Sequence, residues 1–172
     1  RFYFDFRDML SMKPNAGYPY TPSVGLLNGL LTTTNMLLDE GLENVFARHR
    51  HMADGVRAAV RAWGLEICAT DSATASDTVT AIMTPGIDGN ELVSHAETKY
   101  GVSFGAGLGL VAGKLFRIGH LGLLTEAQAL AGIAVAELAM ADMGMDIRLG
   151  SGVAAAQDVY RGDAAIGGEL HP

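Results

Sequence analysis

The sequence predicts an α+β fold in which a small, mainly antiparallel sheet is covered by helices on one face. Apolar residues recur at three and four positions over residues 42–63, as they do on the buried side of an amphipathic helix. Short apolar runs follow, and their length is typical of strands. Between about residues 41 and 145 the expected order is helix, strand, strand, helix, strand, strand, helix. With 49% hydrophobic residues, the 172-residue chain can bury the core of a modest domain.

The first forty residues are expected to form a strand, a loop and a helix. Residues 2–6 alternate aromatic and polar side chains loosely, which favours a strand. Residues 11–23 are rich in proline, glycine and asparagine and are expected to form a loop. Thr21 is a good N-cap and Pro22 is favoured at the first helical position, so a helix is predicted over residues 22–40. This helix is apolar nearly all round and should be well buried.

Four strands are expected after the amphipathic helix. They are residues 65–69, 79–85, 102–109 and 114–118, the third fading into a glycine loop.

Two later helices are marked by their N-caps. Asp88 with Glu91, and Thr125 with Gln128, have the spacing of a capping box. The second of these helices is the last long one. Residues 146–172 are expected to form a short helix at best, followed by a tail.

Composition excludes several classes of function. A formal charge of −7 disfavours nucleic acid and anionic membrane surfaces as partners. The single cysteine, Cys68, excludes an internal disulfide framework and fits a reducing cytoplasm. The most apolar stretch, residues 127–143, contains two carboxylates and is too short to span a bilayer. The chain starts on an apolar run without methionine, so it is expected to be a piece of a longer protein.

Two further patterns predict structure more than chemistry. The stretch GAGLGLVAGK lacks the P-loop glycine, because that position is Leu108, and lacks the P-loop hydroxyl, because Leu115 follows the lysine. Its glycines are expected to shape a turn between strands. The histidines do not cluster with metal-ligand spacing, so no metal site is predicted. His49 lies on an apolar stripe, as core or interface histidines do, and His120 either lines a site or is structural.

Arg117 is the most informative charged residue, because GKLFRIGHLG places it inside an otherwise apolar run. A guanidinium cannot lose its charge in a protein, so its burial requires a partner. Its planar fork suits a substrate carboxylate, but it suits an internal Asp or Glu equally well. The residues alone leave both interpretations open.

The stretch YPYT, residues 18–21, precedes the expected start of a helix. A helix N-terminus attracts anions, and nearby hydroxyl groups add donors. The alternative is a cap with two packing tyrosines.

Taken together, these stretches resemble the C-terminal part of the class V, fold-type I pyridoxal-phosphate aminotransferases, in the alanine–glyoxylate and serine–glyoxylate group. The resemblance is carried by FYFDFRDM, YPYTPS, GLENVFARHR, DTVTAIMTP and GKLFRIGHLG, and it extends to about residue 145. The combination of FRIGHLG with Y-x-x-T and GLEN-x-x-x-RH is fairly specific, although each piece alone is weak. SGVAAAQDVYRG resembles the tail of the serine–glyoxylate branch.

The resemblance implies a domain organisation. Residues 1–22 would be a remnant of the large cofactor-binding domain and residues 23–41 an interdomain helix. Residues 42–145 would form the small C-terminal α+β domain, and residues 146–172 a tail.

The resemblance also implies roles for three residues. Arg117 would bind the α-carboxylate of a small amino or keto acid substrate. Tyr18 and Thr21 would reach across a homodimer to the pyridoxal phosphate of the neighbouring subunit. The full-length protein would be a cytoplasmic aminotransferase that moves an amino group from serine, alanine or aspartate to glyoxylate or another small keto acid.

No catalytic residue is expected in this segment, because the family's Schiff-base lysine lies upstream. Lys13, Lys99 and Lys114 do not match its context, so the 172-residue chain alone should be inactive. The alternative is a non-catalytic α+β module for amino-acid binding or oligomerisation. A desulfurase-like activity would need a mobile cysteine, and Cys68 lies in an expected strand.

Overall fold

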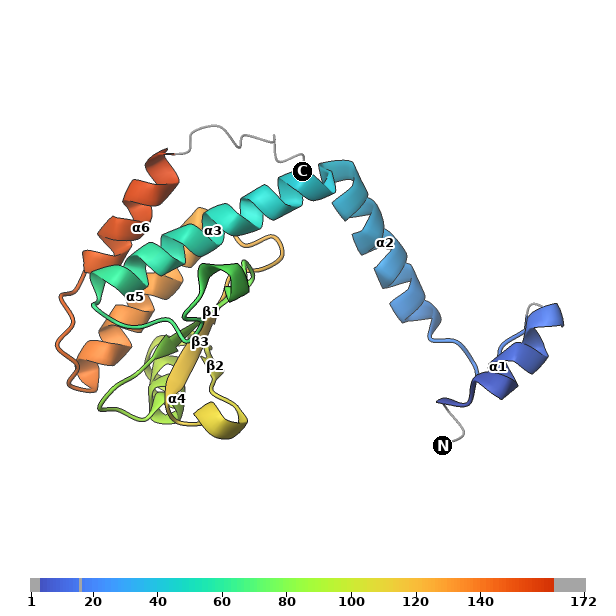
Figure 1. Ribbon diagram of the computed structural model, residues 1–172, viewed down its shortest axis with the longest axis horizontal. Coiled ribbons are helices and arrows are strands. Elements are labelled where there is room, and N and C mark those ends of the chain that lie inside the picture. The colour runs from blue at the N-terminus through green and yellow to red at the C-terminus, as the bar shows by residue number, and fades with distance from the viewer. Residues whose placement is uncertain (1–3, 16, 163–172) are drawn as a thin grey trace. The chain divides into compact units, whose positions relative to one another are not determined.

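The computed structural model describes residues 4–15 and 17–162 (Figure 1). The chain forms two compact units, Arg1–Leu42 and Glu43–Pro172.

The first unit is helical. It contains α1 (Phe6–Met12), the short 3-10 helix η2 (Lys13–Asn15) and α2 (Val24–Glu40). The predicted strand over residues 2–6 is wrong where it can be compared, because Phe6 begins α1; residues 2 and 3 lie outside the described residues. The Asp5 carboxylate accepts a hydrogen bond from the Arg7 backbone N–H at 3.0 Å. This N-cap starts a helix where aromatic alternation alone predicted a strand.

Helix α2 starts at Val24, and its N-cap is Ser23 rather than Thr21. The prediction that it is well buried is wrong for the described chain, since none of its residues is buried. Leu26 is 75% exposed and Leu30 is 63% exposed. Burial depends on a covering surface, and α1 and η2 do not cover this helix.

The second unit has a three-stranded antiparallel sheet with strand order β1-β3-β2. The strands are β1 (Val79–Met83), β2 (Gly105–Ala106) and β3 (Leu115–Gly119). Its helices are α3 (Leu42–Ala62), α4 (Gly89–Tyr100), α5 (Glu126–Asp142) and α6 (Ser151–Gly162), with the 3-10 turns η3 (Ser72–Thr74) and η4 (Gly109–Val111). The α+β prediction with a small antiparallel sheet is confirmed.

Two expected strands are reduced. Residues 65–69 make only an isolated bridge, Ile67 to Ile82, and β2 is two residues long instead of eight. Glycine weakens a strand because it has no side chain to pack, and the segment after Phe104 is rich in glycine. The expected glycine turn between strands is present as η4.

The core lies between one face of the sheet and the helices. Thr80 and Ile82 on β1 face the core in register with Ile118 and Phe116 on β3. Apolar side chains from all four helices of the unit complete this cluster, including Met52, Val56, Val60, Leu92, Ala96, Ile133, Ala136, Met140, Ala156 and Tyr160. Because side chains alternate along a strand, Ala81 and Arg117 lie on the opposite face.

Of the two predicted capping boxes, the one at Thr125 is complete, whereas at Asp88 only the N-cap hydrogen bond is found. The Thr125 side chain accepts from the Gln128 backbone while Gln128 bonds back to Thr125, which is a complete capping box. Asp88 caps α4 by accepting from the Asn90 N–H, and Gly101 ends that helix in the left-handed conformation.

The segment predicted as a tail contributes to the packed fold. Helix α6 is 12 residues long, and its Ala156 and Tyr160 belong to the core cluster. Its first turn is held by Glu137 of α5, whose carboxylate accepts from the N–H groups of Gly150 and Gly152 at 2.6 Å each. A side chain on Gly152 would clash, because its Cβ would lie 2.4 Å from Trp63 Nε1. Residues 163–172 lie outside the described residues.

Candidate functional site

Arg117 lies in the middle of β3, on the face of the sheet that points away from the helical core. Its register partners are Ala81 on β1 and Gly105 on β2, so it is flanked by the two smallest side-chain types. The side chain is half-buried, and its Nε donates to the Ala106 carbonyl at 3.0 Å. Within residues 4–15 and 17–162, no carboxylate forms an ion pair with Arg117. The terminal guanidinium nitrogens therefore keep donors that suit an anionic ligand.

The loop after β3 is held on both sides of Gly122. Arg48 Nη1 donates to the Gly122 carbonyl, and the Gly122 N–H donates to His49 Nε2 at 3.1 Å. Because Nε2 accepts, the ring hydrogen sits on Nδ1 and points to the Val45 carbonyl at 2.7 Å. Arg48 and His49, the RH pair of GLENVFARHR, thus hydrogen-bond the backbone of Gly122 at the end of FRIGHLG. These two motifs, far apart in sequence, meet in the structure.

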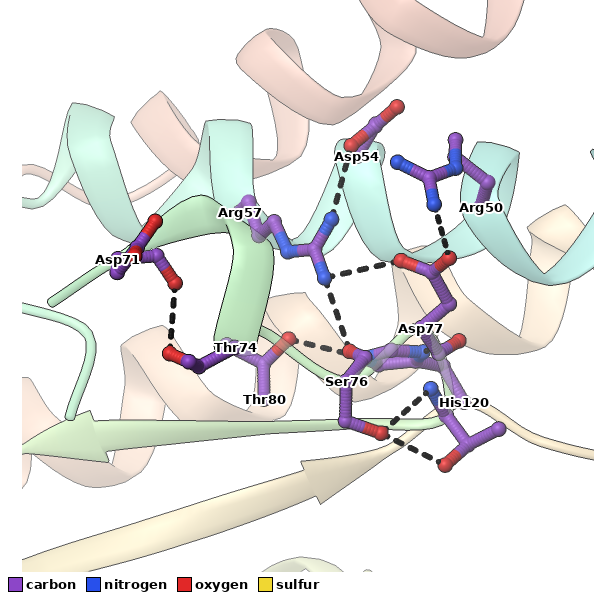
Figure 2. A network of polar contacts seen from close by, with 10 residues as sticks. Arg50, Asp54, Arg57, Asp71, Thr74, Ser76, Asp77, Thr80 and His120 are labelled. Atoms are coloured by element: carbon purple, nitrogen blue, oxygen red, sulfur yellow. Dashed lines mark hydrogen bonds and ion pairs between the residues drawn. The ribbon is translucent and has the colours of Figure 1, made fainter. Parts of the chain in front are cut away.

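A second polar network fixes the segment ahead of β1 against α3 (Figure 2). The Asp77 carboxylate receives Arg50 at 2.9 Å and Arg57 at 3.1 Å. Arg57 also donates to the Asp54 carboxylate and to the Ser76 carbonyl. The donors of Arg57 are thus directed to acceptors of the chain itself, in contrast to the terminal nitrogens of Arg117.

His120 is part of this framework rather than of an open site. It is 1% exposed, with Nδ1 3.0 Å from the Asp77 carbonyl and Nε2 2.9 Å from Thr80 Oγ1 (Figure 2). A carbonyl can only accept, so Nδ1 carries the hydrogen and the Thr80 hydroxyl donates to Nε2. Burial lowers the pKa of His120, and the nearby Arg57 charge adds to this effect. Of the two interpretations of His120, the structural one fits this geometry.

Tyr18 and Thr21 lie in the first unit, on the segment that leads into α2. Both side chains are exposed, Tyr18 by 64%. Neither hydroxyl is bonded to another residue of the part of the chain that the structure describes. Ser23, the N-cap of α2, makes no side-chain cap hydrogen bond. The segment therefore combines uncommitted hydroxyl groups with a helix start that no side chain caps.

Comparison with known proteins shows which family the sequence and fold of the chain resemble. The L-aspartate–glyoxylate aminotransferase of Paracoccus denitrificans (strain Pd 1222) is 60% identical over 162 residues, covering 94% of this chain and 41% of that protein. The serine–glyoxylate aminotransferase of Hyphomicrobium methylovorum is 48% identical, covering 95% of this chain and 41% of that protein. No protein-family model matches the chain.

Solved structures agree with the sequence relatives. Pyridoxamine–pyruvate aminotransferase from Mesorhizobium loti superposes with a TM-score of 0.81 at 41% identity, covering 86% of this chain and 38% of that one. Ureidoglycine–glyoxylate aminotransferase from Bacillus subtilis gives a TM-score of 0.82 at 28% identity, covering 92% and 42%. The chain has the sequence and fold of the C-terminal part of a class V, fold-type I aminotransferase. It spans about two fifths of the length of the curated relatives it matches.

Lys99 of this aminotransferase segment is held by a carboxylate. Lys99 donates to the Asp142 carboxylate at 2.6 Å, and this hydrogen bond raises the pKa of Lys99. A lysine nucleophile works in the opposite direction, with a lowered pKa. This agrees with a segment that covers the C-terminal two fifths of its relatives.

Three further features of this aminotransferase segment concern its cysteine, groups that could hold a metal ion and membrane-spanning helices. Cys68 is exposed, and its backbone N–H is bonded to the Ala81 carbonyl. In the described ranges, no three His, Cys, Asp or Glu residues are grouped so as to hold a metal ion. No helix among these residues has both the length and the apolar character needed to cross a membrane.

The sequence pattern pointed to Arg117 but not to the residues that hold its surroundings. Arg48 entered only as part of the GLEN-x-x-x-RH pattern, and Gly105 only as part of the strand expected over residues 102–109. The histidine on an apolar stripe, His49, was the one local signal of the clamp on Gly122, and it was interpreted as a core or interface residue.

Proposed function

We propose that this chain is the C-terminal part of a pyridoxal-phosphate-dependent aminotransferase. The full-length enzyme moves an amino group from a small amino acid, namely serine, alanine or aspartate, to glyoxylate or another small keto acid. One observation carries the proposal. In a segment similar to glyoxylate aminotransferases, Arg117 lies on the face of the sheet that points away from the helical core, and no described carboxylate pairs with it.

In this function Arg117 binds the substrate's α-carboxylate. The amino donor and the keto acceptor both carry this group, so one guanidinium serves both half-reactions. Binding is charge-assisted and, with a planar fork, orients the substrate as well as holding it. The small side chain of Ala81, its register partner on β1, leaves room for a small substrate beside the arginine.

The cofactor, when bound, supplies an electron sink for the amino transfer. Tyr18 and Thr21 fit its phosphate, because their exposed hydroxyls are available donors and they precede the start of α2. We place these two residues at the phosphate of the neighbouring subunit.

The full-length enzyme is proposed to be a cytoplasmic homodimer. The apolar side chains of α2 are exposed in the described chain, and large exposed apolar surfaces mark interaction sites. A free, exposed Cys68 is compatible with a reducing compartment.

The test of the proposed activity uses the full-length protein that carries this chain, loaded with pyridoxal phosphate. Serine, alanine and aspartate are each offered with glyoxylate, and glycine formation is followed. Ethanolamine, which is serine without its carboxylate, is the matched control substrate. We expect transfer from at least one of the three amino acids and none from ethanolamine. Amino-acid binding without any transfer would support the non-catalytic module instead.

A mixed dimer tests the placement of Tyr18 and Thr21. One subunit lacks its Schiff-base lysine, and the other carries Tyr18→Phe with Thr21→Val. If the two residues act across the dimer, one site holds both defects and the other holds none, so one site per dimer stays fully active. Impairment of both sites would show that they act within their own subunit.

A further inference from the structure

Gly105 lies directly against the Arg117 side chain. The two residues are register partners across the short β2–β3 pair. A Cβ built on Gly105 would lie 3.0 Å from Arg117 Nε, 3.2 Å from its Cβ and 3.3 Å from its Cζ. A carbon atom at these distances is closer than in most packed side-chain contacts, so the arginine would have to shift by a few tenths of an ångström, and the contacts include the guanidinium carbon itself. The arginine side chain therefore occupies the space that any other residue at position 105 would fill.

The residue after Gly105 completes the arrangement. Arg117 Nε donates to the Ala106 carbonyl at 3.0 Å, so one of the guanidinium's edges is committed to the backbone of β2. The Nε–H cannot serve a carboxylate while it makes this bond. Nη1 and Nη2 remain, and these two nitrogens form the end-on fork for bidentate binding.

The glycine that weakens β2 also gives Arg117 space beside the strand. Glycine weakens a strand, and β2 has only two residues. The same absence of a side chain lets the guanidinium approach the strand backbone closely enough for Nε to reach a carbonyl.

We propose that Gly105 is a positioning residue for Arg117: by leaving this space open it lets Ala106 hold Nε, so that the arginine presents Nη1 and Nη2 end-on to the substrate's carboxylate. This inference rests on the proposed function of Arg117. It adds a residue that never touches substrate and acts only through the direction of the guanidinium.

The test is Gly105→Ala in the full-length, cofactor-loaded enzyme. The carboxylate is held in the ground state and the transition state alike, so its misdirected binding should raise KM and leave kcat nearly unchanged. We expect KM for both the amino donor and the keto acceptor to rise about tenfold, as the loss of one charge-assisted hydrogen bond would produce. The matched control is Gly132→Ala on α5, where an added Cβ would meet no atom within 4 Å. Wild-type KM values in Gly105→Ala would overturn the inference while leaving the role of Arg117 intact.

A double-mutant cycle separates positioning from general damage to the fold. In an Arg117→Ala background there is no guanidinium to direct, so Gly105→Ala should have no further effect on either KM. A further rise of the same tenfold size would overturn the inference. If Arg117→Ala itself leaves kcat/KM unchanged, the proposed role of Arg117 fails and the inference fails with it.

Folding is controlled with a second pair of variants. Should Gly105→Ala not yield folded protein, Gly105→Ala with Arg117→Lys removes the crowded guanidinium while keeping a positive charge. Recovery of folded protein in the double variant supports the contact. Failure to recover overturns the proposal that the space at Gly105 serves Arg117.

Discussion

Two charged residues of the second unit, Glu137 and Arg117, differ in burial and in how many hydrogen bonds the chain gives them. Glu137 is 2% exposed, and its carboxylate accepts three hydrogen bonds, from Trp63 Nε1 at 2.9 Å and from the N–H groups of Gly150 and Gly152. Arg117 is half-buried and gives one hydrogen bond to a backbone carbonyl. Glu137 joins α3, α5 and α6, whereas Arg117 joins only two adjacent strands.

The difference teaches how a charged side chain in a folded domain can be assigned a role. Burying a charged group costs free energy unless the group is hydrogen-bonded, and the Glu137 carboxylate accepts all three of its hydrogen bonds from its own chain. Its function is to hold the fold. Arg117 keeps donors for which the described chain offers no carboxylate, and this observation supports its proposed role in binding a substrate carboxylate.

The largest effect is expected from Glu137→Ala. Truncation leaves the Trp63 indole N–H and two backbone N–H groups without their acceptor in the core, and the start of α6 loses its anchor. The free energy of unfolding should fall by about 3 kcal/mol. Urea unfolding followed by fluorescence measures this directly, because Trp63 is the only tryptophan of the chain.

Glu97→Ala is the matched control for Glu137. Glu97 is an exposed glutamate on α4, and its removal should change stability by less than about 0.5 kcal/mol. Equal effects of the two substitutions would break the comparison, because Glu137 would then carry no structural role.

Arg117→Ala should have the next largest effect, on catalysis rather than on stability. In the full-length enzyme kcat/KM should fall about thirtyfold, equivalent to ~2 kcal/mol for one charge-assisted contact. Arg117→Lys should restore only part of the loss, since an ammonium cannot reproduce the planar fork. Steady-state kinetics with the amino donor and the keto acceptor provides the measurement.

Arg61→Ala controls for the loss of one positive charge. Arg61 is exposed at the end of α3, so Arg61→Ala should leave kcat/KM unchanged in the same assay. A loss restricted to one of the two substrates would contradict carboxylate binding, because both substrates carry that group.

His120 provides an intermediate case, a titratable group that is buried in its neutral form. Its pKa is lowered from 6.5 by burial, so below about pH 6.5 the unfolded chain takes up a proton that the folded chain does not. The contribution of His120 to the free energy of unfolding is therefore complete above pH 6.5. It should decline as the pH falls toward the lowered pKa of the folded chain. Urea midpoints measured between pH 8 and pH 5 test the sign.

His120→Gln removes this titration, so its stability should vary less over the same pH range than that of the parent chain. The difference between the two curves isolates His120 from the other histidines. Parallel curves would show that His120 does not contribute through its protonation.

Local features of the fold could be predicted from the sequence. The Thr125–Gln128 capping box and the Asp88 N-cap formed as expected, because each depends on residues within a few positions. Arg117 was identified for the same reason, as a charge inside an apolar run.

Features that depend on distant residues could not be predicted in this way. The strand over residues 65–69 shrank to a bridge because strand pairing is decided by a partner elsewhere in the chain. The prediction that α2 is buried was wrong, because burial depends on a covering surface and α1 and η2 do not cover this helix. The role of Gly105 requires the β2–β3 register, which no local pattern reveals.

The smallest effect is expected for the two hydrogen bonds that Arg48 and His49 make to Gly122. They hold the backbone of a loop, not a buried charge. His49→Ala removes the acceptor of the Gly122 N–H, and Arg48→Ala removes the donor to its carbonyl. Each bond should stabilise the loop by about 1 kcal/mol, so exchange of the Gly122 amide hydrogen should accelerate about fivefold in His49→Ala. Arg61→Ala, on the same helix, should leave this exchange unchanged. Global unfolding free energy should hardly move, since Gly122 and its neighbours Leu121 and Leu123 are exposed. An unaltered exchange rate at Gly122 in His49→Ala would show that the RH pair does not hold the loop that follows the Arg117 strand.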